Sequence, residues 1–98
     1  MASYDLSEDA EARLDEIYAY SIRTFGLETA QRYLLGLHDI FGLLAESPRL
    51  GAEQFALGRG MWRLVYRSHV VYYRPRIAGV FIVDVLHEAQ DPTLRFSR

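Results

Sequence analysis

The chain has 98 residues and a mass of 11.3 kDa, which is the size of one domain with a single modest core. It has no cysteine and all eleven of its basic residues are arginine, so disulfides, thiol catalysis, Schiff-base chemistry and a phosphate-loop lysine are excluded. The formal net charge of -2 hides an asymmetry, because the chain is acidic up to Pro48 and basic from Arg49 onward.

The longest uncharged stretch, residues 77–83, is far shorter than the roughly 20 apolar residues that a helix needs to span a bilayer. The first ten residues lack the basic and then apolar regions of a signal peptide. We therefore expect a soluble, cytoplasmic protein that does not enter a membrane.

The first long element is predicted to be a helix over about residues 8–25. Ser7 is a good N-cap, and acidic residues follow it in the first turn, where they suit the helix dipole. Gly26 is a natural C-terminal stop. Apolar and small residues recur at helical spacing between these two ends, at Ala10, Leu14, Ile17, Ser21 and Phe25.

A second helical pattern begins near Glu28 and must end before Pro48. Its apolar face consists of Ala30, Tyr33, Leu34, Leu37, Ile40, Phe41 and Leu44. Because the link between the two patterns is so short, we expect the helices to pack as an antiparallel hairpin over about residues 8–46.

After an irregular, glycine-rich connection over residues 49–60, the hydrophobic period changes to two. Strands are predicted at about residues 61–66, 69–74 and 80–86, separated by short turns, and these make an antiparallel meander over about residues 61–87. A short strand at residues 3–6 is expected to join the same sheet. The prediction is an α+β domain of β-α-α-β-β-β order over residues 1–98, with the hairpin on one face of an antiparallel four-stranded sheet and a mobile tail at about 92–98.

Strand alternation predicts where the arginines point. Burying Trp62, Leu64 and Tyr66 beneath the helices leaves Arg63 and Arg67 on the other, open face of the sheet. In the last strand the expected core set is Phe81, Val83 and Val85, which places Asp84 on the open face with Ile82 and Leu86. The middle strand has two apolar sets of opposite parity, and the sequence does not decide between them.

Three interpretations of this basic, partly apolar open face compete. It is a solvated sheet face with a few salt bridges, an anion or nucleic-acid surface, or a docking groove for an acidic amphipathic partner segment.

Catalytic motifs are scarce. The run from His87 to Asp91 is similar to a helical zinc motif, but it has aspartate where a second histidine is required and lies at the end of a strand, so we expect no metal site. His87 shares parity with the expected core residues, which favours a hydrogen-bonded structural histidine over a general acid. There is no P-loop, nucleophile elbow or dinucleotide fingerprint, and no cofactor is expected.

Several runs of sequence in both halves of the chain are distinctive. The N-terminal half carries YDLSEDAEARLDEIYAYSIRTFG followed by LETAQRYLLGLHDIFGLLAESPRLG, and the C-terminal half carries GMWR, SHVVYYR and VLHEAQD. With these runs, both halves of the chain resemble ParE-type toxins of bacterial toxin-antitoxin pairs. Positions that match the family's preferences include Tyr4, Leu14, Tyr20, Gly26, Tyr33, Pro48, Gly51, Arg63, His69, Tyr73, Arg74, Leu86, His87 and Asp91. Asp84 departs from the pattern, because many relatives carry a basic residue there, and this departure predicts a changed salt bridge.

The resemblance implies a toxin that shares its fold with RelE-type messenger-RNA nucleases but poisons DNA gyrase. It also implies a ParD-type antitoxin, which dimerises through a ribbon-helix-helix, wraps a helical tail around the toxin in a hetero-oligomer, and supplies the only contact with DNA. RelE-type cleavage commonly uses lysines on the open face, and this chain has none. We therefore expect a non-enzymatic gyrase inhibitor that causes growth arrest. The alternatives are a nuclease using Arg63, Arg67 and His87, and an inert interaction module.

The residues expected to contact the antitoxin or the target are the arginines of the basic half and two residues of the last strand. They are Arg59, Arg63, Arg67, Arg74, Arg76, Asp84 and His87. No catalytic residue is expected among them.

Overall fold

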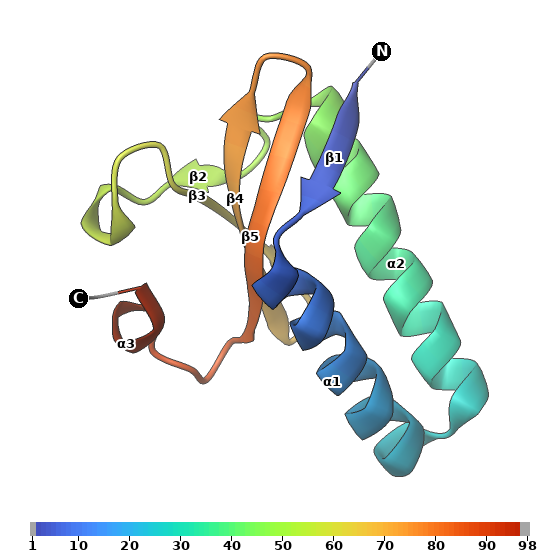
Figure 1. Ribbon diagram of the computed structural model, residues 1–98. Coiled ribbons are helices and arrows are strands. Elements are labelled where there is room, and N and C mark those ends of the chain that lie inside the picture. The colour runs from blue at the N-terminus through green and yellow to red at the C-terminus, as the bar shows by residue number, and fades with distance from the viewer. Residues whose placement is uncertain (1, 97–98) are drawn as a thin grey trace.

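The computed structural model describes residues 2–96, and its two long helices lie side by side on one face of a five-stranded sheet (Figure 1). This arrangement confirms the predicted α+β fold of a helical hairpin on a sheet. In chain order the elements are β1 (Ser3–Leu6), α1 (Glu8–Phe25), α2 (Leu27–Glu46), β2 (Ala52–Glu53), the 3-10 helix η1 (Phe55–Leu57), β3 (Trp62–Tyr66), β4 (His69–Arg76), β5 (Gly79–His87) and α3 (Pro92–Phe96).

Single residues at each end of α1 fix the hairpin. The Oγ of Ser7 accepts a hydrogen bond from the backbone N–H of Ala10 at 2.9 Å and donates one to the carbonyl of Val83 at 2.7 Å, so it both caps α1 and ties it to β5. Gly26 alone links α1 to α2, and its φ of 92° lies in the left-handed region that favours glycine. No helix among residues 2–96 is long and apolar enough to cross a membrane.

The sheet has the strand order β1-β5-β4-β3-β2, and it differs from the predicted one in two ways. First, β1 runs parallel to β5, so the sheet is mixed, because the chain leaves β1 along α1 and returns through the hairpin and the meander before β5 pairs with it. Second, the connection expected to be irregular contains β2, which pairs with Trp62 and Arg63 of β3. A strand of only two residues is too short to produce a visible alternation.

The predicted facing of β3 is confirmed, whereas that of β5 is partly wrong. In β3 the residues that pack against the main core beneath the helices are Trp62, Leu64 and Tyr66. In β5 the residues that do so are Val80, Ile82 and Val85. The predicted face of the sheet is therefore correct for Val85, Asp84 and Leu86. It is wrong for Phe81, Ile82 and Val83.

A β-bulge in β5 causes this failure. Tyr72 of β4 pairs with Asp84 and the next residue, Tyr73, pairs with Ile82, so Val83 is an extra residue in the ladder. A bulge shifts the alternation by one position, and a strict period of two cannot be carried across it. The same register settles β4, where Val71 and Tyr73 lie on the hairpin side of the sheet.

The second face of the sheet is covered, contrary to the expectation of an open face. It carries a small second core of Met61, Val70, Tyr72 and Leu86, packed against Leu57, Val83 and Phe96. Leu57 comes from η1 and Phe96 comes from α3, so two short elements on the side opposite the hairpin exclude water from this face (Figure 1).

The C-terminal segment, for which a mobile tail is predicted at about 92–98, forms α3 as far as Phe96, and residues 97 and 98 lie outside the described residues. The ring of Phe96 packs edge-on against Tyr72 with centroids 5.2 Å apart. Asp91 accepts hydrogen bonds from the backbone N–H and the hydroxyl of Thr93, which fixes the first turn. Packing of Phe96 and this local capping both help to order the segment.

Tyr73 anchors the loop between α2 and β2 to the sheet. Its side chain is fully buried, and its hydroxyl donates to the carbonyl of Pro48 at 2.7 Å and accepts from the backbone N–H of Gly51 at 3.1 Å. A Cβ on Gly51 would lie 2.2 Å from the carbonyl oxygen of Arg63, so the loop approaches β3 more closely than any other residue type allows.

We expect Tyr73→Phe to lower the free energy of unfolding by about 1–3 kcal/mol, because it leaves a partly buried backbone donor and acceptor without their partner. Urea denaturation followed by circular dichroism measures the difference. Tyr20→Phe is the control, because Tyr20 is 57% exposed and should change stability by less than about 0.5 kcal/mol. Equal stability of the two variants would contradict the anchoring role of Tyr73.

Candidate functional site

The seven residues singled out from the sequence do not form one site. Arg59, Arg74 and Arg76 lie at the end of the sheet where β4 turns into β5, and Arg67 and His87 lie at its opposite end. Arg63 and Asp84 occupy the same row across the sheet, because both pair with Tyr72. The structure thus divides the predicted site into two ends and a middle row.

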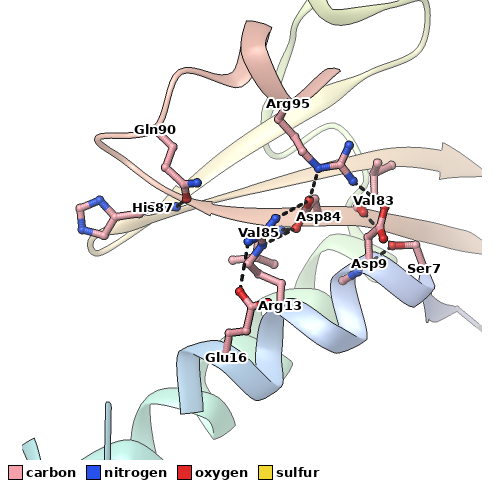
Figure 2. Close-up of polar contacts among 11 residues, drawn as sticks. Ser7, Asp9, Arg13, Glu16, Val83, Asp84, Val85, His87, Gln90 and Arg95 are labelled. Carbon is pink, nitrogen blue, oxygen red and sulfur yellow. Dashed lines mark hydrogen bonds and ion pairs between the residues drawn. The ribbon is translucent and has the colours of Figure 1, made fainter. Parts of the chain in front are cut away.

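Asp84 in the middle row is a buried charge with two guanidinium partners (Figure 2). Arg13 of α1 donates from Nε to Oδ1 at 3.1 Å and from Nη2 to Oδ2 at 3.3 Å, which is the bidentate geometry that a carboxylate prefers. Arg95 of α3 donates from Nε to Oδ2 at 2.7 Å. The backbone N–H of Val85 also donates to Oδ1 at 2.7 Å, so both carboxylate oxygens are satisfied.

Two exposed carboxylates complete this cluster. Arg13 also pairs with Glu16 at 3.2 Å, and Arg95 also pairs with Asp9 at 2.7 Å. The hydrogen bond to Asp84 raises the pKa of Arg13 above its ordinary value, despite the opposing effect of burial. The Asp84 cluster is therefore a structural joint between α1, β5 and α3. No local pattern predicts Arg13 and Arg95 as its partners, because they lie 71 and 11 residues away from Asp84 in the sequence.

A groove of about 700 Å³ lies between α1, the start of α2, the turn after β3 and the end of β5. Its apolar wall comes from α1, where Ile17 is buried but Tyr20 and Phe25 are more than half exposed. Its polar end carries the turn residue Arg67 and two histidines, His69 and His87. An apolar wall ending in cationic and polar groups suits an amphipathic protein segment with acidic residues at one end.

Arg67 lies in the two-residue turn between β3 and β4, and this is why it does not share a face with Arg63. Its φ of 54° is left-handed, which carries the chain round the turn. The guanidinium lies 5.6 Å from the centre of the Tyr66 ring, which belongs to the hairpin side of the sheet. Alternation cannot predict the direction of a side chain in a turn, and the prediction of a shared open face is wrong at Arg67.

The two histidines of the groove face each other across neighbouring strands, with ring centroids 5.6 Å apart. His69 is partly buried, and its Nδ1 lies 2.5 Å from the hydroxyl of Tyr33 on α2. Burial, and then the nearby His87, lower the pKa of His69 below its ordinary value. His87 is exposed and points away from the Asp84 carboxylate, and its Nδ1 accepts from the backbone N–H of Ala89 (Figure 2). The histidine expected to be structural is thus at the surface, and the more buried one is His69.

Comparisons with known proteins agree on one family. The family model described as the ParE toxin of the type II toxin-antitoxin system parDE matches residues 4–92. A toxin ParE1 from Caulobacter vibrioides is 37% identical over 91 residues, which cover 93% of this chain and 94% of the relative. A toxin ParE1 from Mycobacterium tuberculosis H37Rv is 33% identical over 89 residues, which cover 90% of this chain and 91% of the relative.

A solved structure supports the fold. A chain of the chromosomal ParDE TA system from P. aeruginosa superimposes with a TM-score of 0.75, covering 89% of this chain and 96% of that chain. Its sequence identity is 20%, so the likeness concerns the arrangement of helices and strands.

We expect Asp84→Asn to lower the free energy of unfolding by about 3–5 kcal/mol, because it leaves two partly buried guanidiniums without their shared counter-charge. The control is Asp9→Asn, which removes a partner of the same Arg95 from a carboxylate whose side chain is 71% exposed, and should cost about 1 kcal/mol or less. Chemical denaturation of both variants measures the contrast, and a similar small loss in both would show that the Asp84 cluster is not a structural joint.

We also expect the protein to lose stability as the pH falls below about 6.5, the ordinary pKa of histidine. The pKa of His69 is lower in the folded than in the unfolded chain, so the unfolded chain binds more protons in that range and unfolding becomes easier. His87→Asn removes one cause of the shift and should move the pKa of His69 upward. NMR titration of the imidazole signals measures this, and an unchanged or lower pKa would contradict it.

Proposed function

The chain belongs to the family of ParE toxins of type II toxin-antitoxin systems, and we propose that it arrests bacterial growth by inhibiting DNA gyrase until a ParD-type antitoxin binds it. The observation that carries the proposal is the extent of the family match. It runs from Tyr4 in β1 to Pro92, the first residue of α3, and so includes both long helices, strands β2 to β5 and all of β1 except Ser3. The two ParE1 relatives are also covered over nine-tenths of their own length.

The groove beside α1 supports direct binding of the antitoxin. From Arg13 to Phe25 this wall of the groove runs along about 18 Å of helix, which matches three turns of a partner helix. Tyr20 and Phe25 offer exposed aromatic surface, and Arg67 at the far end has an aromatic ring as its neighbour rather than a carboxylate. A helical antitoxin tail with apolar residues on one face and acidic residues near one end would fill the groove and neutralise Arg67.

The positions of the arginines favour a toxin that acts by binding. In the RelE-type alternative, Arg63, Arg67 and His87 would hold one phosphate together. Along the strands, Arg63 lies three residue pairs, or about 10 Å, from the pair that His87 makes with His69. The side chain of Arg63 also projects to the face of the sheet opposite to that of His87. These three groups therefore do not converge on one scissile bond.

Induced expression of the chain, with and without its antitoxin, tests the function. We expect growth arrest with DNA-damage signalling in the absence of the antitoxin, and rescue when the antitoxin is co-expressed. With purified proteins, we expect the chain to inhibit supercoiling by gyrase and the antitoxin to relieve the inhibition. Cleaved messenger RNA with intact chromosomes would overturn the gyrase assignment in favour of a nuclease, and unchanged growth would favour an inert interaction module.

We expect Arg67→Glu to weaken antitoxin binding by at least about tenfold, because it places a carboxylate where the groove should attract one. Arg23→Glu is the matched control: it makes the same charge change on α1, outside the residues that line the groove, and should have little effect. Isothermal titration calorimetry with the antitoxin tail measures both affinities. An equal loss in the two variants would indicate that net charge, and not the groove, governs binding.

A further inference from the structure

Four arginines gather at the end of the sheet opposite the groove, where β4 turns into β5. We call this surface the basic pole, and it consists of Arg49, Arg59, Arg74 and Arg76. Three separate segments contribute to it: the turn after α2, the loop between η1 and β3, and the end of β4. The basic pole and the polar end of the groove lie about 23 Å apart, because β4 runs from His69 to Arg76 between them.

The loop that carries Arg59 has a defined geometry. Arg59 stands between Gly58 and Gly60, whose φ values of 122° and 78° lie in the region that favours glycine. Its carbonyl oxygen accepts a hydrogen bond from Nη1 of Arg74, and a Cβ at either glycine would lie within 3.5 Å of the guanidinium of Arg74. The Arg74 side chain thus holds the loop in place, while the Arg59 side chain is exposed.

A hollow of about 700 Å³ at the basic pole is lined by Arg49 and Arg76 together with Trp62, Pro75, Gly60 and Glu53. Trp62 is the only tryptophan of the chain. Its ring packs against Tyr73 with centroids 6.3 Å apart, so its position is fixed by the core. The hollow therefore has Arg49 and Arg76 among its lining residues beside a fixed aromatic side chain, and the guanidinium of Arg76 stacks over the ring of Phe81, 4.2 Å from its centre.

The charges of the basic pole are poorly neutralised within the chain. Within residues 2–96, no carboxylate oxygen lies within 4.0 Å of a guanidinium nitrogen of Arg49, Arg59 or Arg74. Arg76 has one carboxylate neighbour, Asp5, at 3.9 Å, and both of these side chains are more than half exposed. By contrast, Arg13 and Arg95 are fully committed to the Asp84 cluster. The pole is thus a concentration of available positive charge on a protein whose net charge is negative.

We propose that the basic pole binds the phosphates of double-stranded DNA. Guanidiniums pair with phosphate oxygens through two parallel hydrogen bonds, and an array of them suits a polymer that carries a phosphate on each strand every 3.4 Å along its axis. Arg74 and Arg76 are two residues apart on β4, about 7 Å along the strand, and Arg49 and Arg59 extend the array on neighbouring segments. The resemblance to ParE-type toxins implies contact with DNA through the antitoxin alone, and this surface adds a contact made by the toxin chain itself. The proposal does not depend on the identity of the toxin's target.

Binding of the full chain, without antitoxin, to a short fluorescein-labelled DNA duplex tests the proposal. Fluorescence anisotropy gives the affinity, and the emission of Trp62 reports binding at the hollow. Measured between about 50 and 200 mM salt, the logarithm of the association constant should fall with log salt by about 0.9 for each phosphate contacted. The double variant Arg49→Gln/Arg59→Gln should bind at least about tenfold more weakly, and its salt slope should be shallower by about 2.

The matched control is Arg23→Gln/Arg32→Gln, which removes the same charge from exposed arginines of the hairpin and should change the affinity less than about twofold. An equal loss in the two double variants would overturn the proposal, because it would reflect net charge alone. Absence of duplex binding at the lowest salt would also overturn it. So would competition by polyglutamate as effective as competition by unlabelled duplex, since the pole would then be a docking surface for acidic protein.

Discussion

The buried carboxylate of Asp84 is the interaction on which the rest of the structure depends. A charge removed from water must be paired, and here the pairing comes from three parts of the chain that are distant in sequence. Arg13 brings α1 over β5, Arg95 brings α3 to the opposite side of the sheet, and the backbone of β5 supplies the remaining donor. The hairpin, the sheet and the C-terminal helix are thus held in one relative position by a single side chain. The bulge residue Val83 immediately precedes Asp84 in the sequence. The hydroxyl of Ser7 donates a hydrogen bond to the carbonyl of Val83, so the start of α1 is fixed at the same place.

Local signals in the sequence predict the elements of this fold, and long-range contacts decide what each surface of it does. The two helices have a clear 3.6-residue period with a cap at Ser7 and a stop at Gly26, so their bounds were predictable to within a residue or two. The facing of the β5 side chains was not predictable, because nothing in its run of apolar residues indicates which one is the extra residue of the bulge. The second face of the sheet was expected to be open because Leu57 and Phe96, which cover it, lie in segments without periodicity.

The same contrast between local signals and long-range contacts explains what could be predicted of the candidate site. Charge counting located the arginines in the second half of the chain, and alternation placed Arg63 correctly relative to Trp62. Neither could show that a left-handed turn moves Arg67 to the hairpin side, or that His69 and Tyr33 meet there. Arg59, Arg74 and Arg76 are separated from these groups by the length of β4, so the chain presents two chemically different surfaces. One has an apolar wall and histidines, and the other is formed mainly by arginines without carboxylate partners.

The parallel pairing of β1 with β5 has a consequence for biosynthesis. Ser7 bonds to a carbonyl 76 residues further along the chain, and β1 has no other strand neighbour in the sheet. An incomplete chain still attached to the ribosome can form the local helical hairpin, but it cannot close the sheet until β5 has left the exit tunnel. The sheet therefore closes only after residues 79–87 have been synthesised.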